Sequence, residues 1–271
     1  MNQLAIFSTP KPFVDPHIAT IQRNAILSWK QLGERVEVWL VGEEEGVEQA
    51  ARELGVHYIP DVERTPAGTP RIDSIFNRLR AESTADYLCY VNSDILLFPD
   101  LLRALDVASA RARRFLLVGQ RWDANITTPL PISAEWQVTF LKTFRNESKL
   151  HPPAGSDYFL FPRDLFAEIP PFAVGRIGWD NWMIYHARVT RTAVVDCSDA
   201  VTAVHQNHDF SHLPGGKKHR RQPESLDNVK LAGGFHTMFT LANANKRIIN
   251  SKLVGPKRSR EGLQRELSIL P

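Results

Sequence analysis

The sequence predicts an α/β protein with one mostly parallel central sheet and helices on its faces. Short apolar runs rich in β-branched and aromatic residues alternate along the first hundred residues with stretches whose apolar residues recur at helical spacing. Such alternation is typical of βαβ units, whose strands run parallel. The run from Tyr87 to Leu97 is apolar at most positions, as in a strand buried on both faces of a parallel sheet. A chain of 271 residues suffices for one large domain, and no internal repeat or strong boundary divides it.

The first hundred residues contain four expected strands and the helices between them. Gly33 and Gly55 each follow an amphipathic stretch and are expected to end a helix. Thr69 is expected to cap a further helix, with Pro70 in its first turn. The strands are expected at residues 3–7, 36–41, 56–59 and 87–95, and the helices at 17–32, 47–54, 69–80 and from 99 onward.

The second half is less regular and is expected to elaborate the same domain. Its strands are expected at residues 115–118, 156–161, 193–195 and 201–204, its helices at 134–144 and 178–188, and one helical turn at 164–169.

Charge divides the chain into two parts. Residues 215–271 carry 12 Lys and Arg against 4 Asp and Glu, whereas residues 1–214 carry 21 against 26. We therefore predict a main domain over 1–214 and a basic C-terminal extension over 215–271. The extension is either a solvated tail or a segment that meets phosphates, for example at an anionic membrane surface; no nucleic-acid partner is expected.

Several classes of protein are excluded by what the sequence lacks. No apolar run approaches the roughly 18 residues of a membrane span, and the first residues lack the basic segment of a signal peptide. Cys89 and Cys197 lie in or after apolar runs and are expected to be buried thiols, which indicates a cytoplasmic location. The phosphate loop, the glycine-rich dinucleotide fingerprint and the Gly-x-Ser-x-Gly elbow are all missing, which argues against Rossmann dehydrogenases and α/β-hydrolases.

Asp94 interrupts an apolar run near the end of an expected strand. Open α/β sheets bind ligands at the carboxyl ends of their strands. A Mg²⁺ ion takes one or two protein carboxylates together with substrate phosphates and water, so Asp94, with Asn92 beside it, is a candidate metal ligand. The alternative is an acid that only caps the turn before Pro99.

A second group of candidates follows a short apolar segment. His205, His208 and His212 are three and four residues apart, a spacing that on a helix would gather them on one face to bind Zn²⁺. Asn207 and a following Leu-Pro-Gly-Gly stretch favour a loop instead. His205, directly after the apolar segment, is therefore the best candidate for an ion or phosphate ligand, and the other histidines are equally well explained as surface or loop side chains.

Trp179 and Trp182 are three residues apart on one face of an expected helix. Sugar rings present apolar C–H faces and many hydroxyls, so two indoles with Asp180 and Asn181 between them suit a carbohydrate pocket. A carboxyl group held in such a pocket has a raised pKa, which would fit Asp180 as a general base on a hydroxyl. The alternative is a helix anchored in the core by its tryptophans, with Asp180 as its N-cap.

The order of these segments carries a resemblance over residues 3–212. The segments are the Ser-Thr-Pro loop after the first strand, Gly68-Thr69-Pro70-x-x-Asp73-Ser74, Val91-Asn92-Ser93-Asp94-Ile95, Gly155-Ser156-Asp157-Tyr158, Gly175-Arg176-Ile177-Gly178-Trp179-Asp180, and His205-Gln206-x-His208-Asp209. Together they resemble the nucleotide-diphospho-sugar glycosyltransferases of the GT-A fold, in a family-two-like branch. The resemblance implies a single GT-A-like domain.

The resemblance implies a role for each matching residue. Asp94 would reach a Mn²⁺ or Mg²⁺ ion that bridges the donor diphosphate, and His205 would complete the metal or diphosphate site. Asp180 would be the catalytic base of an inverting enzyme, and Asp157 would bind donor or acceptor hydroxyls. Asn92 stands where the family has the first acid of its Asp-x-Asp motif, which removes one negative ligand. The residues implied near the nucleoside and the phosphates are Thr9, Glu43 and Arg71.

The predicted function is therefore transfer of a sugar from a nucleotide-diphospho-sugar donor to a hydroxyl of a glycan or another acceptor, assisted by Mn²⁺ or Mg²⁺. Two alternatives stay open. A nucleotidyltransferase on a similar sheet would need a glycine-rich loop with a nearby lysine after the first strand, and residues 8–16 contain no glycine. A non-catalytic carbohydrate- or phosphate-binding module would keep the fold without turnover.

Overall fold

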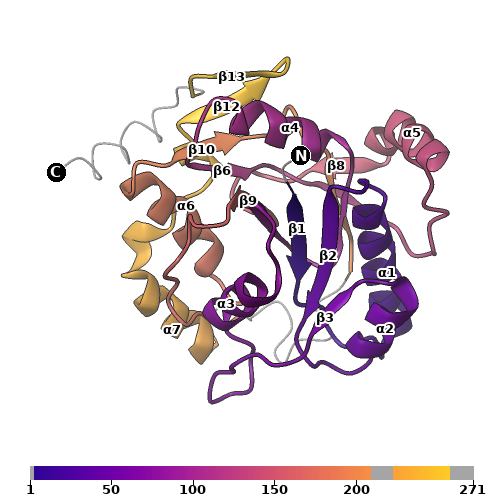
Figure 1. Ribbon diagram of the computed structural model, residues 1–271, viewed down its shortest axis with the longest axis horizontal. Helices are drawn as coiled ribbons and strands as arrows, with labels where there is room; N and C mark the ends of the chain where they lie inside the picture. Colours follow the sequence, from indigo (N-terminus) through magenta and orange to yellow (C-terminus); the bar gives the residue numbers. More distant parts are fainter. Residues whose placement is uncertain (1–2, 209–221, 257–271) are drawn as a thin grey trace.

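The computed structural model describes residues 3–208 and 222–256, which form two β-sheets with helices packed around them (Figure 1). The larger sheet has nine strands. In order across the sheet they are β13 (Lys252–Val254), β12 (Lys246–Ile249), β10 (Ala193–Asp196), β6 (Phe115–Val118), β9 (Tyr158–Pro162), β4 (Tyr87–Val91), β1 (Leu4–Ser8), β2 (Val36–Val41) and β3 (His57–Ile59).

The large sheet is mostly parallel, as predicted. Strands β1 to β4 run in one direction, and β6, β10 and β12 run in the same direction. Strand β9 lies between β4 and β6 and is antiparallel to both, and β13 is an antiparallel edge strand. The carboxyl ends of β1, β2, β3 and β4 therefore meet at one edge of the sheet, where an open α/β fold binds its ligands.

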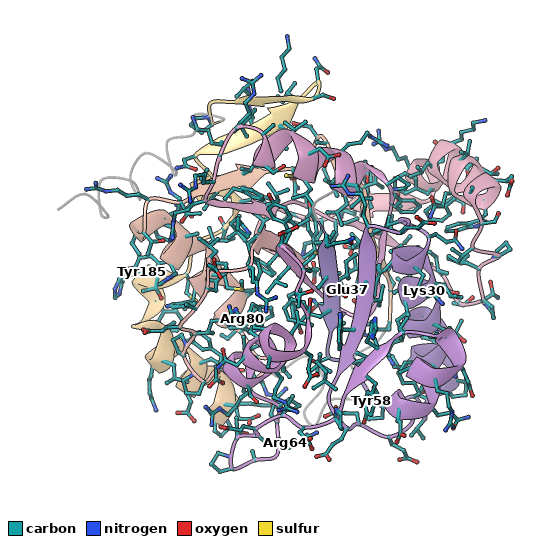
Figure 2. All side chains as sticks on the ribbon, viewed as in Figure 1. Lys30, Glu37, Tyr58, Arg64, Arg80 and Tyr185 are labelled. Atoms are coloured by element: carbon teal, nitrogen blue, oxygen red, sulfur yellow. The ribbon has the colours of Figure 1, made fainter. Side chains whose placement is uncertain are left out.

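Helices cover both faces of the large sheet because its strands are apolar on both sides. Leu4 and Ile6 of β1 face one layer of helices, whereas Ala5 and Phe7, which alternate with them, face the other. The first layer contains α1 (Pro16–Lys30), α2 (Val47–Leu54) and α4 (Asp100–Ser109). The second contains α3 (Ile72–Glu82), α6 (Trp179–Val189) and α7 (Pro223–Ala232). Side chains fill the space between the helices and the sheet (Figure 2).

The second sheet is small and brings distant segments together. Its strands, in order, are β5 (Ile95–Leu97), β11 (Ala203–Gln206), β7 (Trp122–Ala124) and β8 (Ser148–Leu150). Leu96 of β5 and Val204 of β11 form an apolar cluster with the nearby Phe98 and Phe144, and α5 (Ala134–Thr143) packs Trp136 and Phe140 against it. Three short 3₁₀ helices complete the described elements: η1 (Phe144–Asn146), η3 (Phe235–Thr237) and η4 (Leu241–Asn243).

The structure corrects four predicted elements. The apolar run that begins at Tyr87 is two strands, β4 and β5, which belong to different sheets and are joined by the turn at 92–94. The helix expected at Thr69 begins at Ile72, because Pro70 pairs in a β-bridge with Arg64. Residues 164–169, expected as a helical turn, contain only a turn that ends at residue 166, followed by irregular backbone. Asp157 precedes β9 rather than lying within it.

Part of the predicted C-terminal extension joins the large sheet. The proposed boundary after residue 214 and the basic cluster at 217–221 lie outside the described residues, as do residues 257–271. Within the described range, however, β12 pairs with β10, and α7 packs on the same layer as α6. Cys89 and Cys197 are both buried and unpaired, as expected. Among the described residues, no helix combines the length and apolarity that crossing a bilayer requires.

Candidate functional site

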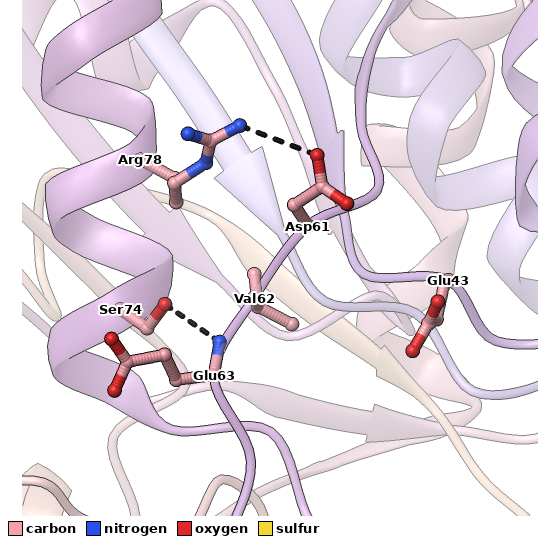
Figure 3. Close-up of a pocket in the computed structure, with 6 residues that line it drawn as sticks. All are labelled: Glu43, Asp61, Val62, Glu63, Ser74 and Arg78. Carbon is pink, nitrogen blue, oxygen red and sulfur yellow. Dashed lines mark hydrogen bonds and ion pairs between the residues drawn. The ribbon is translucent and has the colours of Figure 1, made fainter.

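A pocket opens at the carboxyl ends of β2 and β3 (Figure 3). Its volume is about 350 Å³, and its lining residues are Glu43, Asp61, Val62, Glu63, Ser74 and Arg78. Glu43 follows β2, residues 61–63 follow β3, and the last two residues lie on α3. The Ser74 hydroxyl accepts a hydrogen bond from the backbone N–H of Glu63 at 2.8 Å, which ties the loop after β3 to the helix.

The three residues predicted near the nucleoside and phosphates lie around this edge. Thr9 follows β1 and has a buried hydroxyl with no hydrogen-bond partner among the described residues. Glu43 is exposed and lies 3.3 Å from Nε of Arg64. Arg71 directly precedes α3 and is already engaged, because its guanidinium lies 2.6 Å from both Asp73 and Glu63. Thr9 and Glu43 keep polar atoms available for a ligand, whereas Arg71 would have to leave its acids to reach a phosphate.

Asp94 lies in the tight turn that ends β4. The N–H of Ile95 donates to the carbonyl of Asn92 at 3.1 Å, which closes the turn. The Ser93 hydroxyl donates to Gln22 Oε1 of α1 at 2.8 Å. The backbone N–H and the side-chain amide of Asn92 both donate to Asp157, at 2.9 and 2.8 Å. The turn is therefore held from both sides, and Asp94 projects at the carboxyl end of the sheet with its side chain 11% exposed.

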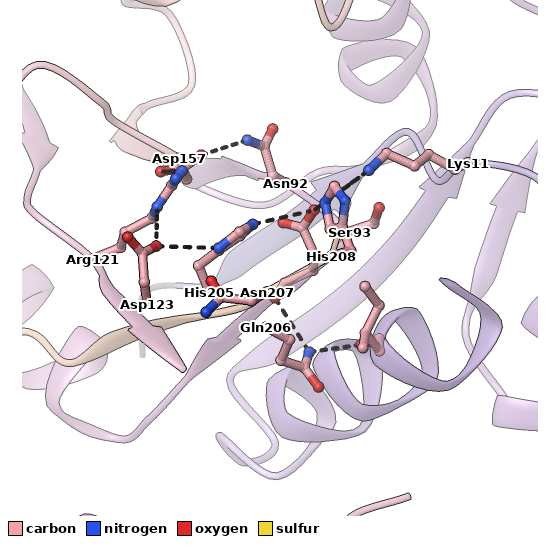
Figure 4. Close-up of polar contacts among 12 residues, drawn as sticks. Lys11, Asn92, Ser93, Arg121, Asp123, Asp157, His205, Gln206, Asn207 and His208 are labelled. Atoms are coloured by element: carbon pink, nitrogen blue, oxygen red, sulfur yellow. Dashed lines mark hydrogen bonds and ion pairs between the residues drawn. The ribbon is translucent and has the colours of Figure 1, made fainter. Parts of the chain in front are cut away.

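Two histidines meet Asp94 (Figure 4). His205 lies on β11, which pairs with β5 so that His205 is opposite Ile95, the residue after Asp94. His208 lies two residues beyond that strand, and its Nε2 is 3.1 Å from Asp94 Oδ2. His205 Nε2 is 4.0 Å from the same oxygen. One ligand atom from each of the three residues lies within 4.8 Å of the others, which is compact enough for a single metal ion.

A lysine, Lys11, also reaches this cluster. Its Nζ is 3.0 Å from His208 Nε2 and 3.7 Å from Asp94 Oδ2. Burial opposes ionisation of Asp94, but the hydrogen bond from His208 and the nearby charges of His205 and Lys11 outweigh it and hold the pKa of Asp94 well below its ordinary value. Asp94 Oδ1 is buried and has no hydrogen-bond partner among the described residues. The acid is thus ionised at neutral pH with one oxygen unused.

A second layer of side chains lies behind His205. Asp123 of β7 lies directly opposite His205 of β11 where these two strands pair. Asp123 Oδ1 lies 3.2 Å from His205 Nδ1. Asp123 also contacts His151 Nδ1 at 2.8 Å and Arg121 Nε at 3.0 Å. Burial raises the pKa of Asp123, but the close contacts with His205, His151 and Arg121 more than compensate, so its pKa is lowered. A carboxylate in this position fixes the ring orientation of a metal-binding histidine.

Asp157 is held next to this layer. Its carboxylate accepts hydrogen bonds from Arg121 at 2.6 Å and from the Asn92 amide at 2.8 Å. The chain Asp94–His205–Asp123–Arg121–Asp157 therefore links the end of β4 to the start of β9 (Figure 4). Asp157 was predicted to bind sugar hydroxyls. Arg121 and Asn92 fix the orientation of its carboxylate and leave other lone pairs of the two oxygens for a ligand.

Asp180 lies in the first turn of α6, after Gly178. Gly178 has φ = 108°, a left-handed backbone conformation that a residue with a side chain rarely adopts, and it directs the chain into the helix. Burial raises the pKa of Asp180 to about 6, opposed by the backbone N–H of Asn181 and supported by the negative charge of Asp157. Asp180 therefore combines closeness to Asp157 with a pKa suited to proton transfer near neutral pH.

The two tryptophans beside Asp180 belong to the core. Trp179 is 5% exposed, and its ring packs against Tyr90 at 5.1 Å and Phe159 at 5.5 Å. Trp182 is 7% exposed and packs against Phe172 and His186. Indoles buried to this degree present no free face to a sugar, so we leave both out of the acceptor site.

Asn181 has a tethering contact. Its side-chain amide donates to the carbonyl of Phe239 at 2.7 Å, which fixes α6 to the segment after η3. It was predicted to bind acceptor or sugar, and its donor group is engaged within the protein.

Four residues of the cluster were not singled out from the sequence. Lys11 and Gln22 lie far from Asp94 along the chain, and Asp123 lies within a short strand, β7, that has no distinctive sequence pattern. Arg121 has only its position two residues before Asp123 to mark it. His208 could have been selected as a metal ligand, because it stands three residues after His205. Its position next to Asp94, however, depends on the pairing of β11 with β5 and β7, which the sequence pattern does not show.

Comparisons with known proteins identify the fold. No family model matches the chain, and it has no significant match among curated protein sequences. Among solved structures it is similar to glucosyl-3-phosphoglycerate synthase from Mycobacterium tuberculosis in complex with Mn²⁺, UDP and glucosyl-3-phosphoglycerate: TM-score 0.54, 15% identity, covering 86% of this chain and 81% of that chain. The same synthase with Mn²⁺, UDP-glucose and phosphoglyceric acid matches with a TM-score of 0.52 and 14% identity, covering 86% and 80%. Its complex with Mg²⁺ and UDP matches with a TM-score of 0.51 and 15% identity, over the same shares. This chain therefore has the GT-A-like fold that its sequence predicted.

Proposed function

We propose that this chain is a metal-assisted glycosyltransferase, which moves a sugar from a nucleotide-diphospho-sugar to an acceptor hydroxyl. The observation that carries the proposal is the meeting of Asp94, His205 and His208 at the carboxyl end of β4. Their fold is shared with a synthase that binds Mn²⁺ together with UDP-glucose. The order of motifs along the sequence supports the same function independently.

The three side chains fit a divalent metal ion. Asp94 Oδ1 is a buried acceptor with no partner among the described residues, so the carboxylate gains stability from a cation bound close to it. Asp94 Oδ2 and His208 Nε2 are 3.1 Å apart, and two ligands of one ion at right angles, each about 2.1 Å away, would lie about 3 Å apart. Two imidazoles with one carboxylate suit a transition ion such as Mn²⁺ better than Mg²⁺, which prefers oxygen ligands.

Each residue of the cluster has a defined task in this proposal. A bound ion supplies positive charge that stabilises the leaving diphosphate. Asp94, His205 and His208 would hold that ion. Asp123 orients the ring of His205 through its contact with Nδ1. Asn92 serves the diphosphate site indirectly, because its amide holds Asp157 and its backbone closes the turn that presents Asp94.

Asp180 is the proposed general base. It would accept the proton of the acceptor hydroxyl as that oxygen attacks the anomeric carbon. A pKa of about 6 leaves Asp180 ionised at neutral pH and more basic than an exposed aspartate, which favours proton transfer. Asp157 would bind a sugar hydroxyl with the lone pairs that Arg121 and Asn92 do not use. The nucleoside would lie toward Thr9 and Glu43, at the ends of β1 and β2. Two buried thiols fit the cytoplasmic location that we propose for the enzyme.

A donor screen tests the function. The full-length protein is incubated with a panel of UDP- and GDP-sugars, Mn²⁺ and candidate hydroxyl acceptors, and nucleotide release is measured. We expect release with one donor class, loss of release when the metal is chelated, and loss in Asp94→Asn. Asp227→Asn, which changes an exposed acid on α7, is the matched control and is expected to keep the wild-type rate.

Two other results would contradict the proposal. Binding of nucleotide-sugars with no release across the panel would identify a binding module. Formation of a nucleotide-sugar and pyrophosphate from a nucleoside triphosphate and a sugar phosphate would identify a nucleotidyltransferase.

A further inference from the structure

We propose that Lys11 is a second cation of the donor site. In the free protein its ammonium group contacts Asp94 and His208, and when the metal ion binds it moves to contact the donor diphosphate. The inference rests on the proposed function, because it assumes that a metal ion and a diphosphate meet at Asp94. It assigns to Lys11 a role in donor binding that neither its place in the sequence nor the predicted motifs suggest.

The first observation is where the ammonium group lies. Lys11 Nζ is 3.0 Å from His208 Nε2 and 3.7 Å from Asp94 Oδ2, so it contacts two of the three atoms that would bind the metal (Figure 4). Its side chain is 31% exposed, whereas that of Asp94 is 11% exposed. The ammonium thus contacts atoms that a metal ion would bind, and the side chain that carries it is more exposed than that of Asp94.

The second observation is a conflict at His208. Its Nε2 lies 3.0 Å from Lys11 Nζ, which can only donate, and 3.1 Å from Asp94 Oδ2, which as a carboxylate can only accept. A single ring nitrogen carries either a proton or a lone pair, so it can satisfy one neighbour and not both. A metal ion removes the conflict, because it takes the lone pairs of both the imidazole and the carboxylate. It also excludes Lys11, because two cations cannot share the same two ligand atoms.

The third observation is that Gln22 holds the backbone of Lys11. The Lys11 N–H donates to Gln22 Oε1 at 2.7 Å, and its carbonyl accepts from Gln22 Nε2 at 3.0 Å. The same Gln22 oxygen accepts from Ser93, the residue beside Asp94. The base of the side chain is therefore anchored to the metal turn, and the flexible four-carbon stem lets the ammonium relocate without backbone movement.

The displaced ammonium has a natural destination. Lys11 lies in the loop after β1, next to the residues proposed to bind the donor, and a diphosphate bound to the metal brings anionic oxygens to this edge. The Asp-x-Asp motif of GT-A glycosyltransferases has two carboxylates, whereas this cluster has one, Asp94. The single negative charge of Asp94 does not neutralise the two positive charges of the metal ion. Diphosphate oxygens then balance both the ion and Lys11, which makes metal and diphosphate binding mutually favourable.

The test compares wild-type protein with Lys11→Met in two binding titrations that need no turnover. In the first, Mn²⁺ alone is titrated and free ion is followed by electron paramagnetic resonance. Loss of the competing charge should tighten Mn²⁺ binding by about tenfold. In the second, UDP and GDP are each titrated calorimetrically at saturating Mn²⁺. Loss of a charge-assisted hydrogen bond should weaken the better ligand by at least about tenfold.

Two further variants separate charge from structure. Lys11→Arg keeps a positive charge and should bind the diphosphate more tightly than Lys11→Met. Lys142→Met changes an exposed lysine of α5 and should leave both titrations unchanged. Equal Mn²⁺ and nucleotide affinities in wild type and Lys11→Met would overturn the inference while leaving the proposed function intact. A wild-type protein that binds neither Mn²⁺ nor a nucleoside diphosphate would instead contradict the proposed function itself.

Discussion

Asp94 shows how a single residue can depend on its surroundings for its chemistry. One oxygen contacts His208 and lies near Lys11, whereas the other is buried without a partner among the described residues. Burial alone would favour the neutral acid, but the hydrogen bond from His208 and the electrostatic effects of His205 and Lys11 lower the pKa of Asp94 and keep the carboxylate ionised. Asp180 has the opposite balance, because burial dominates and raises its pKa to about 6. The two acids are therefore suited to different tasks, one to holding a cation and the other to accepting a proton.

The first prediction concerns the rate and its pH dependence. Asp180→Asn should lower the transfer rate at least about a hundredfold, because the amide cannot accept a proton. In the wild type, the rate should rise with pH as Asp180 ionises and level off above its pKa of about 6. Initial rates between pH 5 and 8 measure both effects. Full activity in Asp180→Asn would remove this residue from the mechanism.

The same acid affects stability. Its pKa is about 6 when folded and near 3.8 when unfolded, so between these values the unfolded chain ionises while the folded protein keeps its proton. The free energy of unfolding therefore falls as pH rises from about 4 to about 6, and above pH 6 the full loss caused by burying the Asp180 carboxylate is present. Asp180→Asn has no such deficit and should be more stable than the wild type at pH 8, by at most about 3 kcal/mol. Urea unfolding at pH 8 and pH 4 measures the difference, and an equal gain at both pH values would speak against the raised pKa.

The next prediction concerns the role of Asp123 in metal binding. Asp123→Asn should weaken Mn²⁺ binding by about ten- to a hundredfold, because His205 loses the carboxylate that orients its ring. Calorimetric titration with Mn²⁺ measures this directly. Asp106→Asn, which changes an exposed acid on α4, is the control. If Asp123→Asn binds Mn²⁺ as the wild type does, then His205 does not need this partner.

At the scale of elements, the decisive feature is the split of one apolar run into β4 and β5. Both strands are buried, so hydrophobicity alone gives no sign that they belong to different sheets. The polar turn at 92–94 marks the break, and the pairing of β5 with β11 brings His205 to it. Helix α6 shows the reverse case. The spacing of Trp179 and Trp182 marks one face of the helix, as expected, but that face packs into the core.

This core position gives a prediction about Trp182. Trp182→Ala should destabilise the protein by about 3–5 kcal/mol, because it removes a large buried side chain that packs on Phe172. Urea unfolding measures the loss, with Trp136→Ala on the partly buried face of α5 as a comparison at a separate cluster. A variant of unchanged stability that binds sugar acceptors less tightly would restore the carbohydrate-platform interpretation.

At the scale of the whole molecule, the fold was predictable and the site only partly so. Alternating periodicities predicted the α/β class, and the order of polar motifs predicted which strand ends carry chemistry. The antiparallel β9, the small second sheet and the joining of β12 to the large sheet depend on long-range pairing, which short sequence patterns do not encode. Asp94 and His205 were predicted because each ends or follows an apolar run. Lys11 and Asp123 join them only through long-range contacts, so they were found only in the folded protein.

The central claim is that Asp94, His205 and His208 hold one metal ion on the donor diphosphate. A crystal structure of the protein with Mn²⁺ and the nucleotide-sugar selected by the donor screen tests it most directly, with anomalous scattering recorded at the manganese absorption edge. We predict one manganese peak about 2.1–2.3 Å from a carboxylate oxygen of Asp94 and from Nε2 of both histidines, also contacting the diphosphate. A nucleotide-sugar bound with no manganese peak at these residues would contradict the claim.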